Sequence, residues 1–256
     1  MHDADSTIAY DGSFPGFLCA CAESLNAQDP APRVVRASVP ESLFEERLAV
    51  RRDDGRASSL WERMTRKAGT ESMQVVLEAF LSDIDGADAA AAAAMRRVRT
   101  EGGAALRDLS DADMLTVEKA AHRSRQEAHL LCGLVRFSEL SDGTWYAPLE
   151  PSCDALILMA DHFAARFGSM RFALHDRRRG SAVLHEPSRG WRLVDGFSLE
   201  ASAAASGGLY SACEYEVRNL WRLYFRTAAI ESRTNPRLQS SRMPAHYWNL
   251  LTEMAD

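Results

Sequence analysis

The sequence contains no run of about 18 or more apolar residues, so we expect no transmembrane helix and no membrane partner. The N-terminal stretch, MHDADSTIAYDG, is acidic and lacks the apolar core segment of a secretory signal. We therefore expect a cytoplasmic protein. The hydrophobic fraction of 46% is sufficient for a substantial buried core.

Cysteine is scarce and its positions are scattered, which argues against a disulfide framework. The five cysteines are Cys19, Cys21, Cys132, Cys153 and Cys213. The pair in CAC does not favour a shared metal, because helical residues two apart point in different directions. The sequence also lacks a Walker A loop, GxGxxG, CxxxCxxC, GxSxG, HExxH and a zinc-deaminase signature. We therefore expect no metal and no cofactor, and exclude recognisable NTPases, hydrolases and radical S-adenosylmethionine enzymes.

Lysine is nearly absent: the only two are Lys67 and Lys119. The net charge of −6 is uneven, with 14 Lys and Arg against 21 Asp and Glu in residues 1–120. Residues 121–256 hold 16 Arg against 15 acidic residues. Arginine suits bidentate phosphate contacts, although an arginine-rich codon usage explains the bias equally well. Nucleic-acid binding would therefore need a local arginine patch rather than a broadly basic domain.

Hydrophobic periodicity predicts a mixed fold. Short strands are expected at 7–10 and 33–39, with a helix between them that begins near Ser13, and mainly helices from about 58 to 134. Two hairpins, LVRFSELSDGTWYAPLE and MRFALHDRRRGSAVLHE, flank the helix SCDALILMADHFAARFG.

A long helix and a short helix are expected to follow the hairpins. We predict an α+β fold in which an antiparallel sheet of hairpins packs against several helices. A single unit over 1–256 is expected, and a subdivision into 1–110 and 111–256 stays open.

Several phrases carry a family resemblance: YDGSFPGFLCA, RQEAHLLCGLVRF, WYAPLEPSCD, DHFAARF and LWRLYFRTAAIESRTNPRLQSSRMPAHYW. Together they resemble a bacterial family of DNA-metabolism or DNA-repair proteins, from about Ile8 to Glu253, with the weakest match over 45–110. The resemblance implies a partnership with a radical S-adenosylmethionine protein of DNA modification or repair. It also implies that the C-terminal part occurs fused to uracil-DNA glycosylase-like domains. It assigns no catalytic residues.

The stretch RQEAHLLCGLVRF supplies the first candidate site. Glu127 and His129 are the candidate catalytic residues, since a histidine can exchange protons near neutral pH. Arg125 and Arg136 are candidates for holding phosphate. The alternative is structural: Glu127 pairs with a nearby arginine, and His129 forms a hydrogen bond at the junction of helix and sheet.

Further candidate nucleic-acid contacts lie in three later segments. They are His162 and Arg166 in DHFAARF, Arg177, Arg178 and Arg179 in DRRRG, and Arg233 and Arg237 near the last helices. An arginine run in a turn is also a common solvated surface. The aromatic stripe Trp221, Tyr224 and Phe225 is expected in the core rather than as a stacking platform, as are Tyr247 and Trp248.

The resemblance and the arginine pattern together predict a DNA repair or modification accessory protein that binds DNA, the radical S-adenosylmethionine partner, or both. Its contact surface would be a cleft lined by Arg125, Glu127, His129, Arg136, His162, Arg166 and Arg233. Two alternatives stay open. One is an enzyme that acts on a base or nucleotide by acid–base chemistry, and the other is an interaction module without DNA contact.

Overall fold

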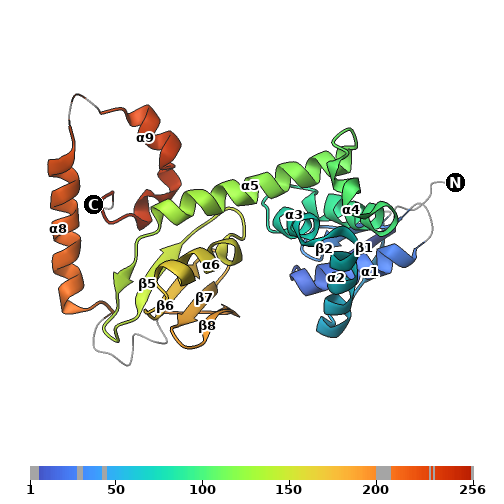
Figure 1. Cartoon of the computed structure of the whole chain (residues 1–256), viewed down its shortest axis with the longest axis horizontal. Helices are drawn as coiled ribbons and strands as arrows, with labels where there is room; N and C mark the ends of the chain where they lie inside the picture. Colours follow the sequence, from blue (N-terminus) through green and yellow to red (C-terminus); the bar gives the residue numbers. More distant parts are fainter. Residues whose placement is uncertain are drawn as a thin grey trace. The chain divides into compact units, whose positions relative to one another are not determined.

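The computed structural model describes residues 6–27, 31–41, 45–199, 209–230, 232 and 234–254. The chain divides into two compact units, Met1–Arg125 and Gln126–Asp256, each of which is described by itself (Figure 1). The division falls inside helix α5 (Ala112–Leu134), whereas the sequence analysis considered one after residue 110. Within the described ranges no helix is long and apolar enough to cross a lipid bilayer.

The first unit contains a parallel three-stranded sheet in the order β2-β1-β3. Its strands are β1 (Ser6–Tyr10), β2 (Arg33–Arg36) and β3 (Glu46–Ala49). The central strand reads STIAY, and its last four residues are all buried. This apolar run is typical of a parallel strand that is covered on both faces. The two strands expected from the sequence are present, and β3 is an addition.

Helices α1 (Phe14–Asn26) and α4 (Ala87–Glu101) contact this sheet. Helices α2 (Asp54–Ala68), α3 (Thr70–Phe80) and the short η1 (Gly102–Arg107) pack on α1 or α4, and the unit also includes the start of α5. The hydroxyl of Ser13 accepts the N–H of Gly16 at 3.1 Å, which confirms Ser13 as the cap of α1. The alanine run of α4 is largely buried, and its small side chains let neighbouring helices approach closely.

The second unit contains a five-stranded sheet in the order β4-β5-β6-β7-β8. Its strands are β4 (Ser138–Glu139), β5 (Trp145–Leu149), β6 (Phe172–Asp176), β7 (Ser181–Glu186) and β8 (Gly190–Asp195). Both expected hairpins, β4–β5 and β6–β7, are confirmed. Strands β5 and β6 run parallel because α6 (Leu156–Arg166) connects them. Mostly antiparallel pairing in this sheet, together with the helices, confirms the α+β class.

The core of the second unit forms where α5, α6 and the end of the chain pack on this sheet. Tyr247, in the short helix η3 (Ala245–Leu250), is 3% exposed and belongs to this core, as expected. The prediction that the aromatic stripe of α8 (Ala212–Ala228) lies in the core is wrong, since Trp221 and Tyr224 are 38% and 61% exposed. The reason is that α8 contacts its unit largely through polar side chains. Helix α9 (Pro236–Arg242) completes the described helices of this unit.

Candidate functional site

The segment after β5, residues 150–154, is held by a buried carboxylate from α5. Glu127 is 4% exposed and accepts the backbone N–H groups of Ser152 at 2.9 Å and Cys153 at 2.7 Å. The hydroxyl of Tyr247 donates to the same carboxylate. Burial raises the pKa of Glu127, but these hydrogen bonds outweigh burial and hold the pKa below its ordinary value. Glu127 is therefore an ionised acceptor at neutral pH.

The β6–β7 turn is built around a second buried carboxylate. The side chain of Asp176 is fully buried and accepts the backbone N–H groups of Arg178 at 2.9 Å and Arg179 at 3.1 Å. The Arg179 guanidinium lies 2.8 Å from the Asp176 carboxylate and also donates to the carbonyls of Pro151 and Ser152. Arg179 therefore joins this turn to the segment that Glu127 holds.

The same turn presents two other arginines to solvent. The Arg177 side chain is 52% exposed, and its nearest carboxylate is Glu150 at 3.6 Å. Arg178 is exposed and has no ion-pair partner among the residues that the structure describes. Because Asp176 and Arg179 fix the backbone, both cations project from a rigid support at the carboxyl ends of the parallel strands β5 and β6. The DRRRG motif thus has one structural arginine and two that are available for a ligand.

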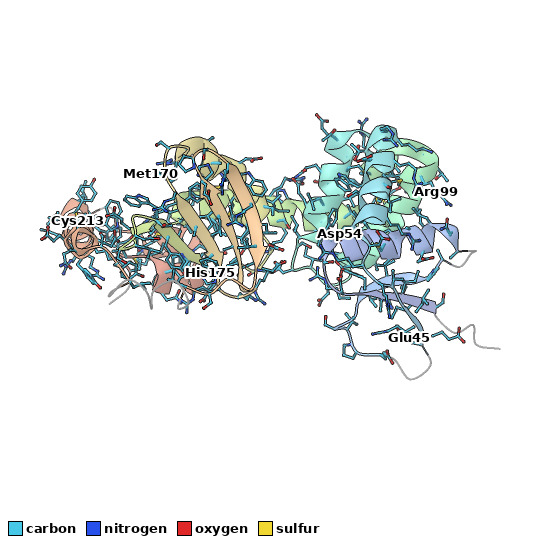
Figure 2. All side chains as sticks on the ribbon, turned by 90° about the horizontal axis from the view of Figure 1, so that it is seen from below. Glu45, Asp54, Arg99, Met170, His175 and Cys213 are labelled. Carbon is cyan, nitrogen blue, oxygen red and sulfur yellow. The ribbon has the colours of Figure 1, made fainter. Side chains whose placement is uncertain are left out.

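A polar pair that the sequence analysis missed lies beside this turn. Figure 2 labels His175 in the second unit. Its Nδ1 atom is 2.8 Å from the hydroxyl of Tyr146, and the two side chains come from neighbouring strands. Burial lowers the pKa of His175, and the nearby Arg177 lowers it further. Burial also raises the pKa of Tyr146 to about 12. Both side chains are therefore neutral at pH 7. In FALHDR, side chains two residues apart point to the same face of a strand, which puts His175 and Arg177 on one face. This alternation was the sequence signal that could have indicated the pair.

Two of the predicted phosphate ligands are engaged by carboxylates. Arg125 lies 2.6 Å from Glu78 and 2.9 Å from Glu118 within the first unit. Arg136 lies 2.6 Å from Glu253, whose side chain is only 1% exposed. Arg136 also donates to carbonyls at the end of α5. These contacts give both arginines structural partners in the absence of any ligand.

The remaining predicted residues stay apart from this network. His129 is exposed, on the face of α5 opposite to the buried Glu127, so the two do not form an acid–base pair. His162 and Arg166 are exposed on α6, and Arg166 lies over the ring of Phe167 at 5.5 Å. No contact in the described part of the chain joins His129 to His162. Of the last two predicted contacts, Arg237 is exposed at the start of α9, and Arg233 lies outside the described residues.

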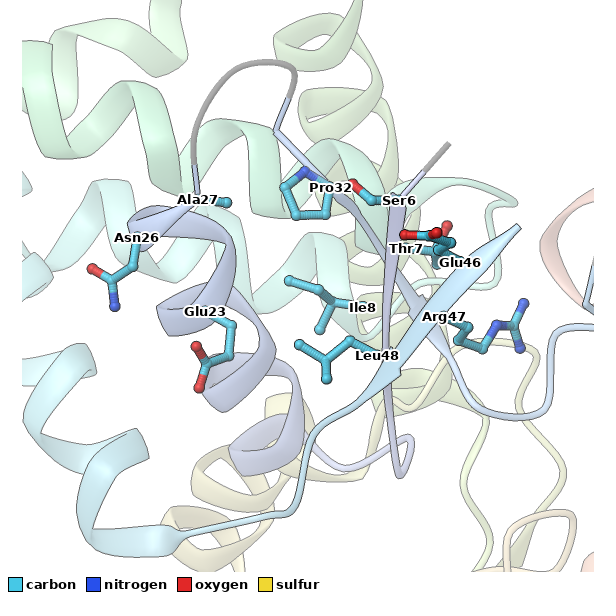
Figure 3. Close-up of a pocket in the computed structure, with 10 residues that line it drawn as sticks. All are labelled: Ser6, Thr7, Ile8, Glu23, Asn26, Ala27, Pro32, Glu46, Arg47 and Leu48. Carbon is cyan, nitrogen blue, oxygen red and sulfur yellow. The ribbon is translucent and has the colours of Figure 1, made fainter. Parts of the chain in front are cut away.

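The described residues hold no group of three or more His, Cys, Asp or Glu arranged to bind a metal ion. A hollow of about 470 Å³ lies at the amino ends of β1 and β3 in the first unit (Figure 3). Of its charged residues, Arg47 pairs with Glu45 at 2.9 Å and Glu23 pairs with Arg56 at 2.7 Å. Arg47 also donates to two backbone carbonyls, so its guanidinium is held by contacts within the unit.

Comparison with known proteins gives a match to a family of unknown function. No curated protein and no solved structure matches the chain. The model of the family DUF4130, a domain of unknown function, matches residues 86–253, about two thirds of the chain. The matched range contains Glu127, the 150–154 segment, the β6–β7 turn and Tyr247. By this match the chain belongs to the DUF4130 family.

Proposed function

We propose that the protein is a nucleic-acid-binding accessory protein of DNA repair or modification that works with a radical S-adenosylmethionine protein. The DNA contact is carried by one observation: a rigid turn presents Arg177 and Arg178 to solvent. The partner and the repair context are supported by the family resemblance of the sequence motifs. Phosphate groups of the DNA backbone are the ligands that these arginines suit.

The turn fits this role because its geometry is fixed before a ligand arrives. The Asp176 carboxylate and the Arg179 guanidinium hold the turn backbone, so little backbone freedom is lost when Arg177 and Arg178 bind. Arginines held only by flexible loops would lose more conformational entropy on binding. A carboxylate 3.6 Å away competes weakly for Arg177, because that side chain is half exposed and solvent screens the pair.

The experiment is binding of the full chain to single- and double-stranded DNA as a function of salt concentration. The variant Arg177→Ala/Arg178→Ala should lower the slope of log affinity against log salt by about one to two units. Arg189→Ala is the control for the loss of one cation, because Arg189 lies in the β7–β8 turn and its side chain is 79% exposed. We expect that control to bind as the unchanged protein does.

Two results would contradict the proposal. One is no detectable binding at about 50 mM salt, either with the protein alone or with the radical S-adenosylmethionine partner. The other is a loss of slope per removed arginine in Arg189→Ala that equals the loss per removed arginine in the double variant. That result would show that any exposed arginine contributes and that the turn is not a specific contact. Unfolding curves of each variant establish that lost binding does not reflect lost structure.

The second candidate is an enzyme that acts on a base or nucleotide by acid–base chemistry, and the His175–Tyr146 pair favours it. A neutral histidine hydrogen-bonded to a neutral tyrosine can pass a proton while Arg177 holds a nearby phosphate. His175→Ala and Tyr146→Phe should each abolish turnover of damaged DNA in the presence of the partner. Normal turnover by both folded variants would exclude these residues from the chemistry.

A further inference from the structure

Two adjoining hollows in the first unit share one arginine. The first, of about 370 Å³, lies beside the segment after β3 and includes Arg51 and Arg52. The second, of about 580 Å³, is lined by residues of α1, α2 and the end of α4. Both include Arg56. We call the cations that line them the basic tract; its members are Arg51, Arg52, Arg56, Arg63, Lys67 and Arg99.

Three cations of the tract follow one face of a single helix. Arg56, Arg63 and Lys67 lie on α2 at spacings of seven and four residues, which place side chains on the same side of a helix. At about 1.5 Å per residue they extend over about 16 Å. That distance corresponds to about five base pairs of a duplex, at about 3.4 Å each. The row is therefore long enough to contact several phosphates of one strand.

Carboxylates neutralise only part of the tract. Arg56 pairs with Glu23 at 2.7 Å, and Arg52 pairs with Asp54 at 2.6 Å. Among the described residues, no carboxylate forms an ion pair with the other four: Arg51, Arg63, Lys67 and Arg99. A positive surface remains in a unit where 21 acidic residues outnumber 16 basic ones, so it does not simply follow composition.

Two cations of the tract donate to backbone carbonyls near the ends of helices, and each keeps further N–H donors for a ligand. Lys67 donates to the backbone carbonyl of Arg99 near the end of α4, and Arg99 donates to the carbonyl of Leu25 near the end of α1. An ammonium group has three N–H donors and a guanidinium group has five. Arg63 lies mid-helix and Arg51 precedes α2, so the ends of helices account for neither.

We propose that the basic tract is a second nucleic-acid contact, which binds backbone phosphates of DNA. This inference rests on the proposed function. The amide of Asn26 and the hydroxyl of Ser59 also line the second hollow and can bind phosphate or sugar oxygens. Apart from Arg99, the tract precedes the range 86–253 that the family model matches, so it belongs to the N-terminal part of this chain.

The test is salt-dependent DNA binding by full-length Arg51→Gln/Arg63→Gln/Lys67→Gln. These three residues are exposed and have no carboxylate partner in the described ranges, so folding should persist. We expect the salt slope to fall by about two to three units and the affinity at low salt to fall at least about tenfold. Arg66→Gln/Arg107→Gln/Lys119→Gln is the control, which removes three exposed cations of the same unit outside the hollows.

The outcomes separate this inference from the proposed function. If Arg177→Ala/Arg178→Ala weakens binding and the tract variant does not, the tract inference is wrong and the proposed function stands. An equal loss in tract and control variants also overturns the tract, since it shows a diffuse charge effect. If ATP competes as strongly, at equal molarity, as an oligonucleotide of about 12 nucleotides, the tract is a free-nucleotide site instead. Absence of all DNA binding by the unchanged protein overturns both proposals.

Discussion

The hydroxyl of Tyr247 donates a hydrogen bond to the carboxylate of Glu127, which lies 120 residues earlier in the chain. The same carboxylate accepts two backbone N–H groups from Ser152 and Cys153. One buried anion therefore joins α5, the segment after β5 and the last short helix. This arrangement gives Glu127 a structural role that can be measured.

Glu127→Gln should destabilise the protein without abolishing a folded state. The amide has one oxygen acceptor where the carboxylate has two, and its NH₂ group faces donors, so a buried N–H loses its partner. We expect a loss of about 1–3 kcal/mol in the free energy of unfolding. Tyr247→Phe removes one donor and should cost about 1 kcal/mol. Denaturant unfolding measures both, and an unchanged midpoint for Glu127→Gln would contradict the structural role.

The stabilising effect of Glu127 should depend on pH. Its pKa in the folded protein is lower than its ordinary value, since the hydrogen bonds outweigh the opposing effect of burial. The contribution is therefore complete above the ordinary pKa of the carboxyl group and is lost as pH falls through the lowered pKa. Unfolding curves between pH 7 and pH 3 should show a smaller acid-side loss of stability in Glu127→Gln than in the unchanged protein. Parallel pH profiles would exclude this assignment.

Arg136→Ala should be strongly destabilising because it removes the ion-pair partner of the buried Glu253 carboxylate. The Glu253 side chain is almost fully buried, and it also accepts the indole N–H of Trp221 at 2.8 Å. Losing one partner of a buried pair costs about 3–5 kcal/mol, and partial exposure of Arg136 places the expected loss near the lower value. Adding Glu253→Gln should recover part of it, since the stranded charge is gone. A purely DNA-binding Arg136 would leave the unfolding midpoint unchanged.

In the second unit, local sequence patterns predicted the strands correctly but did not predict where the charged residues lie or what they contact. Alternation and turn residues were sufficient for the hairpins, because strand pairing across a short turn is a local property. Glu127 is held by Tyr247 and by two backbone N–H groups about 25 residues later in the chain. Side-chain spacing within a helix cannot predict contacts with such distant residues. Arg136 likewise resembled a phosphate ligand because its partner, Glu253, lies near the other end of the chain.

The N-terminal unit shows a related limit. The strand β1 and the cap Ser13 follow from STIAYDGSFPGF alone, since both depend on neighbouring residues. The basic tract did not follow from the sequence, because the fold brings Lys67 and Arg99, 32 residues apart in the chain, to the same hollow. The net charge over residues 1–120 is an average and does not contain that placement.

Gly16→Ala should be destabilising, against the usual gain from replacing a helical glycine. A Cβ atom at Gly16 would lie 2.0 Å from a carboxylate oxygen of Asp11, so the side chain of Asp11 must move. That oxygen also accepts the N–H and hydroxyl of Ser13, and moving it breaks both bonds. We expect a loss of about 1–3 kcal/mol, typical of overpacking.

Asp11→Ala provides the matched background for this substitution. With the carboxylate absent, Gly16→Ala should be neutral or stabilising by up to about 1 kcal/mol, as at other helical sites. A double-mutant cycle from unfolding curves measures the difference. Equal effects of Gly16→Ala in the two backgrounds would show that Asp11 is not the obstacle.

Apolar residues on the outer side of α8 should contribute little to the stability of the chain. Leu220 and Tyr224 are 64% and 61% exposed, while Glu214, Arg218 and Arg222 on the other side bond to the rest of the unit. Leu220→Ser and Tyr224→Ser should each change the free energy of unfolding by less than about 0.5 kcal/mol. Phe163→Ala, at a core position that is 3% exposed, should cost about 3–5 kcal/mol. A loss above about 1.5 kcal/mol for Leu220→Ser would mean that this side of α8 is covered, because an exposed leucine cannot lose that much buried area.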